Sequence, residues 1–135
     1  MVLSIVFADF QLYLADWFFL FFHSGLILFN LIGWIWRKTR KAHLITISLT
    51  LLSWGFLGIW YGWGYCPLTD WHWQVLEKLG TPNLPNSYIS YLLDRIFGWK
   101  PDQKWVDGGT LGLTLLAFGM SIWVNWKKAR SDDRQ

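Results

Sequence analysis

Three long stretches of the chain are apolar enough to cross a lipid bilayer. Residues 44–65 and 108–126 contain no Asp, Glu, Lys or Arg, and each exceeds the roughly 18 apolar residues that a transmembrane helix needs. Residues 13–36 are similar, although they include one Asp and one His. We therefore predict an all-α membrane protein in which residues 1–135 form one integral membrane domain. Its three spans are expected at about residues 13–36, 43–65 and 105–126.

The remaining segments predict shorter elements. In residues 66–104, Thr69 or Asp70 is suited to cap one helix, and Asn86 or Ser87 is suited to begin another. Neither helix is long enough to span, and their aromatic residues suit the headgroup layer of a membrane. We expect two interfacial amphipathic helices on the outer side. The first twelve residues either extend the first span as one helix or form a fourth, short N-terminal segment.

Composition and charge agree with this class and suggest an orientation. The chain is 53% hydrophobic and 16% charged, and it contains 12 Trp, which is too apolar and too charge-poor for an ordinary soluble domain. Residues 37–41 and the tail 127–135 hold eight of the twelve Lys and Arg. Because cytoplasmic flanks collect basic residues, both segments are expected in the cytoplasm, with the N-terminus and residues 66–104 outside. The partners predicted from this charge are anionic lipids, and no clustered basic and aromatic surface indicates nucleic acid.

Four polar residues in the N-terminal part of the chain fall seven positions apart: Asp9, Asp16, His23 and Asn30. A seven-residue repeat drifts only about 20° per step on a helix, so these side chains share one stripe. Asp9 is expected outside the hydrocarbon. The other three should face protein, because a buried ionisable group costs several kcal/mol unless it finds a partner.

Small residues on the later spans offer a surface for this stripe. Helix backbones approach closely where small residues recur at four- or seven-residue spacing, which favours a three-helix bundle with the stripe inside. Counting helical rise inward from each boundary places the Thr114 hydroxyl or the Trp54 indole opposite His23. The small residues predicted to mediate packing are Ser48, Gly55, Gly62, Gly108, Gly112, Ala117 and Ser121.

His23 has two interpretations. With Asp16 it is a candidate proton or ion relay, because intramembrane His and carboxylate groups recur in such pathways. The alternative is a neutral histidine that is hydrogen-bonded to a neighbouring helix. His43 lies about 20 Å from His23 along the membrane normal, so these two residues do not hold one haem iron. A haem held by His23 together with a partner subunit stays open.

Cys66 has three interpretations. It is either a reactive thiol, or a metal ligand with His72 and Asp70, or a small apolar residue that precedes a helix capped by Thr69. One Cys and one His are too few for the usual zinc site, so no metal site is predicted. The patterns of hydrolase triads and phosphate-binding glycine loops are absent from the sequence, and no catalytic residue is predicted.

Several short motifs occur in a recognisable order: "LAD" and then His23, His43 opening the second span, "CPLT", "LEKLG", "YISYLL", and a final span before a basic tail. This order resembles a family of small bacterial inner-membrane proteins that is catalogued only as a domain of unknown function. The resemblance covers about residues 14–127, and this sequence departs from the family by inserting "DWHWQV". The resemblance implies a multi-pass protein of the bacterial inner membrane. It singles out Asp16, His23, His43, Cys66 and Thr69 without assigning chemistry.

Three functions from different classes follow from these observations. The first, which we favour, is an accessory or assembly subunit of a larger membrane complex, whose partners are lipid and other membrane subunits. The second is a homo-oligomeric proton or ion pathway through Asp16 and His23. The third is a redox or cofactor-binding subunit with a haem, quinone or pigment shared with a partner, although the sequence specifies no cofactor. An enzyme is the less expected outcome.

Overall fold

The computed structural model describes residues 1–135, and every regular element in it is helical. Three helical segments are long and apolar enough to cross a membrane: Val2–Ile32, Arg40–Tyr61 and Gln103–Asp132. The predicted all-α fold with three helices able to span a membrane is confirmed, and two shorter helices lie between the second and the third. The elements in chain order are α1 (Val2–Ile32), α2 (Arg40–Leu52), a π-helical turn (Ser53–Leu57), α3 (Gly58–Tyr61), α4 (Pro67–Lys78), α5 (Tyr88–Phe97) and α6 (Gln103–Asp132).

Helix α1 settles the question of the first twelve residues. It is continuous over 31 residues, about 46 Å at 1.5 Å per residue, so these residues extend the first span. No Gly or Pro occurs between Val2 and Ser24, which leaves nothing to break the helix there. The helix ends at Ile32, earlier than the predicted boundary at residue 36. The helix is longer than the roughly 30 Å thickness of the hydrocarbon core, so in a membrane it either tilts or protrudes.

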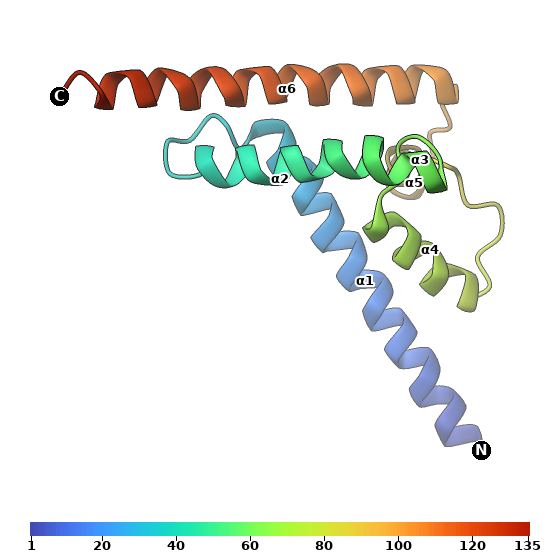
Figure 1. The fold of residues 1–135 in the computed structure, drawn as a ribbon. Coiled ribbons are helices and arrows are strands. Elements are labelled where there is room, and N and C mark those ends of the chain that lie inside the picture. The colour runs from blue at the N-terminus through green and yellow to red at the C-terminus, as the bar shows by residue number, and fades with distance from the viewer.

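The three spans do not form an even bundle. Helices α2 and α6 run side by side in opposite directions, whereas α1 crosses them obliquely and its N-terminal half diverges from both (Figure 1). Helix α4 packs along α1 on the side where the spans separate, and α5 contacts α6. The expected three-helix bundle is therefore wrong for the N-terminal half of α1, because residues 2–11 are exposed throughout and the middle of the helix, at Asp16 and Leu20, packs on α4.

The two shorter helices lie at one end of the molecule, which we call the α4/α5 end. The other end, with residues 37–41 and 127–134, we call the basic end. Ser87 caps α5 as predicted, and its hydroxyl accepts a hydrogen bond from the Ser90 backbone N–H. The predicted cap of α4 by Thr69 or Asp70 is wrong. Helix α4 begins at Pro67, whose missing N–H needs no partner at a first helical position.

Most of the apolar surface faces outward. Only 15 of 135 residues are buried, and large side chains such as Phe21, Trp60 and Leu116 are more than half exposed. Monomeric soluble proteins rarely expose an apolar surface this extensive. It matches the lipid-facing surface of helices that cross a membrane.

Candidate functional site

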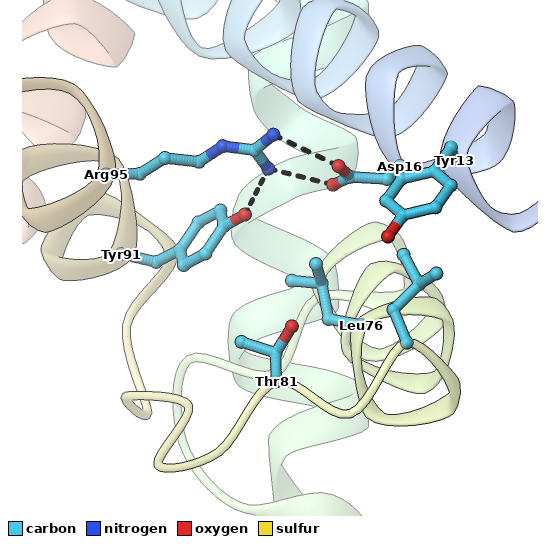
Figure 2. A pocket seen from close by; sticks show the side chains of 7 residues that line it. Tyr13, Asp16, Leu76, Thr81, Tyr91 and Arg95 are labelled. Atoms are coloured by element: carbon cyan, nitrogen blue, oxygen red, sulfur yellow. Dashed lines mark hydrogen bonds and ion pairs between the residues drawn. The ribbon is translucent and has the colours of Figure 1, made fainter.

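The main polar site of the molecule is built around Asp16 on α1. The Asp16 side chain is 7% exposed, and one of its oxygens, Oδ1, accepts hydrogen bonds from His72 Nε2 at 2.7 Å and from Arg95 Nη1 at 2.8 Å. Its other oxygen accepts from Arg95 Nη2 at 3.0 Å. Figure 2 shows this two-pronged contact and the hydroxyl of Tyr91, to which Arg95 also donates. Asp16 thus joins α1 to both α4 and α5.

His72 is fully buried and extends the site by one more hydrogen bond. Its Nδ1 lies 2.9 Å from the Tyr88 hydroxyl on α5. Because a carboxylate only accepts hydrogen bonds, Nε2 carries the proton that is donated to Asp16. In the neutral ring, Nδ1 then accepts the Tyr88 hydroxyl proton. We call Asp16, His72, Tyr88, Tyr91 and Arg95 the Asp16 cluster.

The electrostatics of the Asp16 cluster favour one charged pair and one neutral histidine. Burial lowers the pKa of His72, and the hydrogen bond and charge of Asp16 oppose that shift without cancelling it. The hydrogen bond to Asp16 is the largest cause that raises the pKa of Arg95 above its ordinary value. Burial likewise raises the pKa of Tyr88 and of Tyr91. At neutral pH the cluster therefore contains one guanidinium and neutral His and Tyr side chains around the Asp16 carboxyl.

A cavity of about 300 Å³ adjoins the Asp16 cluster. Asp16 and Arg95 lie on one side of it, and Leu76 and Thr81 lie opposite (Figure 2). The two ionised partners compensate each other's charge, so the cavity offers hydrogen-bonding groups without a strong net charge. Its complete lining is Tyr13, Asp16, Leu76, Leu79, Thr81, Tyr91 and Arg95.

His23 is buried beside the cluster, with 5% of its surface exposed. Its Nε2 lies 3.7 Å from Cys66 Sγ, and its ring centroid lies 4.0 Å from that of Tyr88. The prediction that Thr114 or Trp54 is its partner is wrong. The count of helical rise assumed three parallel spans, whereas the start of α4 reaches His23 directly. The Nδ1 atom of His23 is buried without a hydrogen-bond partner.

The other two members of the polar stripe have different surroundings. Asn30 is half-buried, and its Nδ2 donates to Thr50 Oγ1 on α2 at 2.9 Å. Asp9 is exposed on the N-terminal half of α1. Asp16 and His23 are not hydrogen-bonded to each other. Asp16 bonds to His72, His72 bonds to Tyr88, and the Tyr88 ring packs against His23.

His43 forms a second buried site near the basic end. It is fully buried, with Nε2 at 2.8 Å from the Asn30 carbonyl and Nδ1 at 2.9 Å from Ser121 Oγ. Since a carbonyl only accepts, Nε2 carries the proton. Asn125 Nδ2 also donates to the Arg40 carbonyl at 3.1 Å. We call His43, Asn30, Thr50, Ser121 and Asn125 the His43 cluster, and it joins all three spans.

The small residues predicted to mediate packing divide into two groups. Ala117 and Ser121 are buried on α6. A side-chain carbon added at Gly55, Gly108 or Gly112 would meet nothing within 4 Å, so within this chain the expected close approach at these glycines does not occur. Gly62 ends α3 with a φ of +108°, and Ser48 is half-buried.

The remaining candidates take no part in either cluster. Thr69 lies in the first turn of α4, and Thr114 is half-buried on α6. No group of three or more His, Cys, Asp or Glu residues lies close enough to hold a metal ion. Cys66 Sγ lies 3.7 Å from His23 Nε2.

Sequence reasoning missed three members of the Asp16 cluster: Tyr88, Tyr91 and Arg95. Their spacing carried a usable signal, because positions i, i+3 and i+7 share one face of a helix. Arg95 is also the one basic residue of α5. A lone cation on an aromatic face, next to a span that contains an unpaired Asp, indicates an ion pair between the two helices.

Comparison with known proteins gives the family of this chain. No curated protein and no solved structure matches it. A family model described as "Protein of Unknown function (DUF2784)" matches residues 13–126. This match covers α2 to α5, residues 13–32 of α1 and residues 103–126 of α6, together with both polar clusters. The chain belongs to the DUF2784 family of proteins of unknown function.

Proposed function

We propose that this chain is an accessory or assembly subunit of a larger membrane complex, and that the outward face of α6 binds a transmembrane helix of another subunit. The observation that carries the proposal is a file of three exposed glycines, Gly108, Gly112 and Gly119. None of them would bring an added side-chain carbon within 4 Å of another group in this chain.

The direction of this file supports a contact outside the chain. Ala117, Ser121 and other buried residues mark the face of α6 that packs within the protein. At 100° per residue, the three glycines lie within about 40° of the direction opposite Ala117. The small residues of α6 therefore lie on two different surfaces. Ala117 and Ser121 face inward, and Gly108 and Gly112 face outward.

Membrane helices associate mainly through close packing, since lipid tails are as apolar as the helices themselves. Three glycines on one lipid-facing stripe expose backbone that a second helix packs against closely, whereas lipid chains fill such a surface less well. The same glycines give up helix propensity, at roughly 1 kcal/mol each relative to Ala. Close packing against another helix would offset this cost of having glycine at the three positions.

The test is purification of the full chain from its native membrane in mild detergent, followed by mass spectrometry of the proteins that co-purify. The wild type is expected to bring down stable partner subunits, and Gly112→Ile is expected to lose them. Gly25→Ile is the matched control, because Gly25 is also an exposed helical glycine with nothing within 4 Å. A monomer without partners, or equal recovery from both variants, would contradict the proposal.

We also infer an orientation and a location. The basic end carries eight of the twelve Lys and Arg, which supports a cytoplasmic position for that end in a bacterial inner membrane. A reporter enzyme that is active only in the cytoplasm, fused after Gln135, is expected to be active. An inactive fusion with normal expression would contradict this orientation.

A second candidate function is an oligomeric proton or ion pathway through Asp16 and His23. One observation favours it: Asp16, His72 and Tyr88 form a hydrogen-bonded series that ends against the ring of His23. The pathway predicts proton flux in vesicles that contain the purified protein, and loss of that flux in His23→Leu. Unchanged flux in a folded His23→Leu protein would exclude it.

A further inference from the structure

A second cavity, of about 240 Å³, lies between the end of α1 and the middle of α6. Its lining on α6 spans residues 113–120, about 10 Å along the helix axis. All of its lining side chains are hydrophobic: Leu31, Trp34, Leu113, Leu116, Ala117 and Met120. We call this cavity the α1/α6 groove.

Arg40 stands at the end of the α1/α6 groove. Its Nε donates to the carbonyl of Trp34 at 3.1 Å, and the Trp34 indole in turn donates to the Leu31 carbonyl at 3.0 Å. The Arg40 backbone carbonyl accepts from Asn125, just over one turn of α6 beyond Met120. The first of these bonds places the Arg40 guanidinium beside one groove residue, Trp34, at the basic end. Its Nη atoms form no hydrogen bond or ion pair within the chain.

Charge is distributed unevenly along the molecule, and Trp34 of the groove is hydrogen-bonded to Arg40 in its positive part. Residues 37–41 and 127–134 contain eight basic and two acidic residues, whereas the rest of the chain contains four basic and seven acidic ones. A basic cluster next to a span attracts anionic lipid headgroups by about 1 kcal/mol per Lys or Arg. The apolar groove and the free guanidinium thus complement the two parts of an anionic lipid.

We propose that the α1/α6 groove binds one acyl chain of an anionic phospholipid and that Arg40 binds the phosphate. The acyl chain of the lipid lies along the groove from Trp34 toward Leu113, so the lipid headgroup remains at the level of the basic end. An Arg guanidinium suits this role because its planar fork offers two parallel N–H donors to phosphate oxygens. This site does not depend on the glycine face of α6.

The test uses the full chain in vesicles of about nine parts phosphatidylcholine to one part phosphatidylglycerol with identical acyl chains. A photoreactive amino acid replaces Leu116, which lines the groove, or Leu115, which is the next residue and does not. Mass spectrometry then identifies the lipids that are attached after illumination. At Leu116 the phosphatidylglycerol share is expected to be about fivefold above its share in the bilayer. At Leu115 it is expected to match the bilayer.

Charge variants identify the headgroup contact. Arg40→Gln is expected to remove the enrichment at Leu116, while Arg40→Lys retains part of it and Arg134→Gln leaves it unchanged. The last variant removes the same charge from the exposed tail. Partial enrichment in Arg40→Lys would show that the protein still folds after substitution at this position. The loss in Arg40→Gln would then reflect the lost phosphate contact.

Three results would overturn the proposal. Equal enrichment at Leu115 and Leu116 would mean that the basic end attracts lipid without a site. Loss of enrichment in Arg134→Gln to the same extent as in Arg40→Gln would exclude a specific role for Arg40. Protein adducts in place of lipid adducts at Leu116 would show that another helix fills the groove.

Discussion

The Asp16 cluster and the His43 cluster both bury a histidine between helices, but they use different chemistry. In the Asp16 cluster, His72 donates to a carboxylate that also binds a guanidinium. In the His43 cluster, the ring contacts only a hydroxyl and a backbone carbonyl. A charged pair is costly to bury and costlier to break, whereas neutral hydrogen bonds between membrane helices contribute little each. The two clusters should therefore respond differently to substitution and to pH.

The largest effect is expected from removal of Arg95. Arg95→Leu leaves the buried Asp16 carboxylate without its main partner, and breaking a buried pair in this way costs about 3 kcal/mol. The free energy of unfolding in mixed detergent micelles measures the loss. Lys100→Leu is the control, since Lys100 pairs with Asp94 only at 3.9 Å and is 78% exposed, and such pairs contribute little. Equal losses in both variants would contradict a special role for the Asp16 cluster.

A smaller effect is expected at the His43 cluster. His43→Leu removes two hydrogen bonds and leaves the Ser121 hydroxyl and the Asn30 carbonyl without this partner. The expected loss is about 1–2 kcal/mol in the same unfolding measurement. If His43→Leu cost more than Arg95→Leu, the contrast between the charged and the neutral cluster would be reversed.

The pH dependence separates the two clusters further. Because burial lowers the pKa of His72 below the 6.5 of an exposed histidine, the unfolded chain binds a proton that the folded chain resists. The stabilising contribution of neutral His72 is fully present above pH 6.5 and is lost as the pH falls below that value. Unfolding measured between pH 7.5 and about 5 should show this loss in the wild type and in His43→Leu. A wild-type protein that becomes more stable on acidification would refute the assignment.

The smallest effect is expected at the edge of the His43 cluster. Thr50→Val keeps the shape of the side chain and removes the hydroxyl that accepts a hydrogen bond from Asn30 Nδ2. Such bonds between membrane helices average about 0.6 kcal/mol. Thr114→Val is the control, because the Thr114 hydroxyl makes no hydrogen bond to a side chain in either cluster. A loss that Thr114→Val reproduces would mean that the Asn30 contact contributes nothing of its own.

The sequence predicts the spans well because their signal is local. Length and apolarity define each span within one stretch of chain, and the start of α5 follows from the capping residue Ser87. The sequence allows either one continuous α1 or a separate segment for the first twelve residues, although the absence of Gly and Pro there favours one helix. Boundaries that depend on turns, such as the start of α4 at Pro67, were less accurate.

The partners inside the site were harder to predict because they are distant in the sequence. Asp16 and His72 are 56 residues apart, and no periodicity relates α1 to α4. The placement of His23 opposite Thr114 or Trp54 failed because it assumed parallel helices at equal depth, whereas α1 runs obliquely (Figure 1). For the same reason, the sequence predicts packing inside the chain for Gly108 and Gly112 of α6, whereas the structure leaves the space beside both open.

Both clusters use the buried polar groups of the chain to join its own helices. On the outward face of α6, where we propose that another protein binds, a side-chain carbon added at Gly108, Gly112 or Gly119 would meet nothing in this chain. Site-specific photocrosslinking along α6 in the native membrane tests this claim most directly. A photoreactive residue is placed at each position from 106 to 124, and crosslinked protein products are measured. We expect the yield of protein crosslinks to follow a helical period, with maxima near Gly108, Gly112, Leu115 and Gly119. Maxima centred on the opposite, buried face near Ala117, or only lipid adducts at every position, would contradict it.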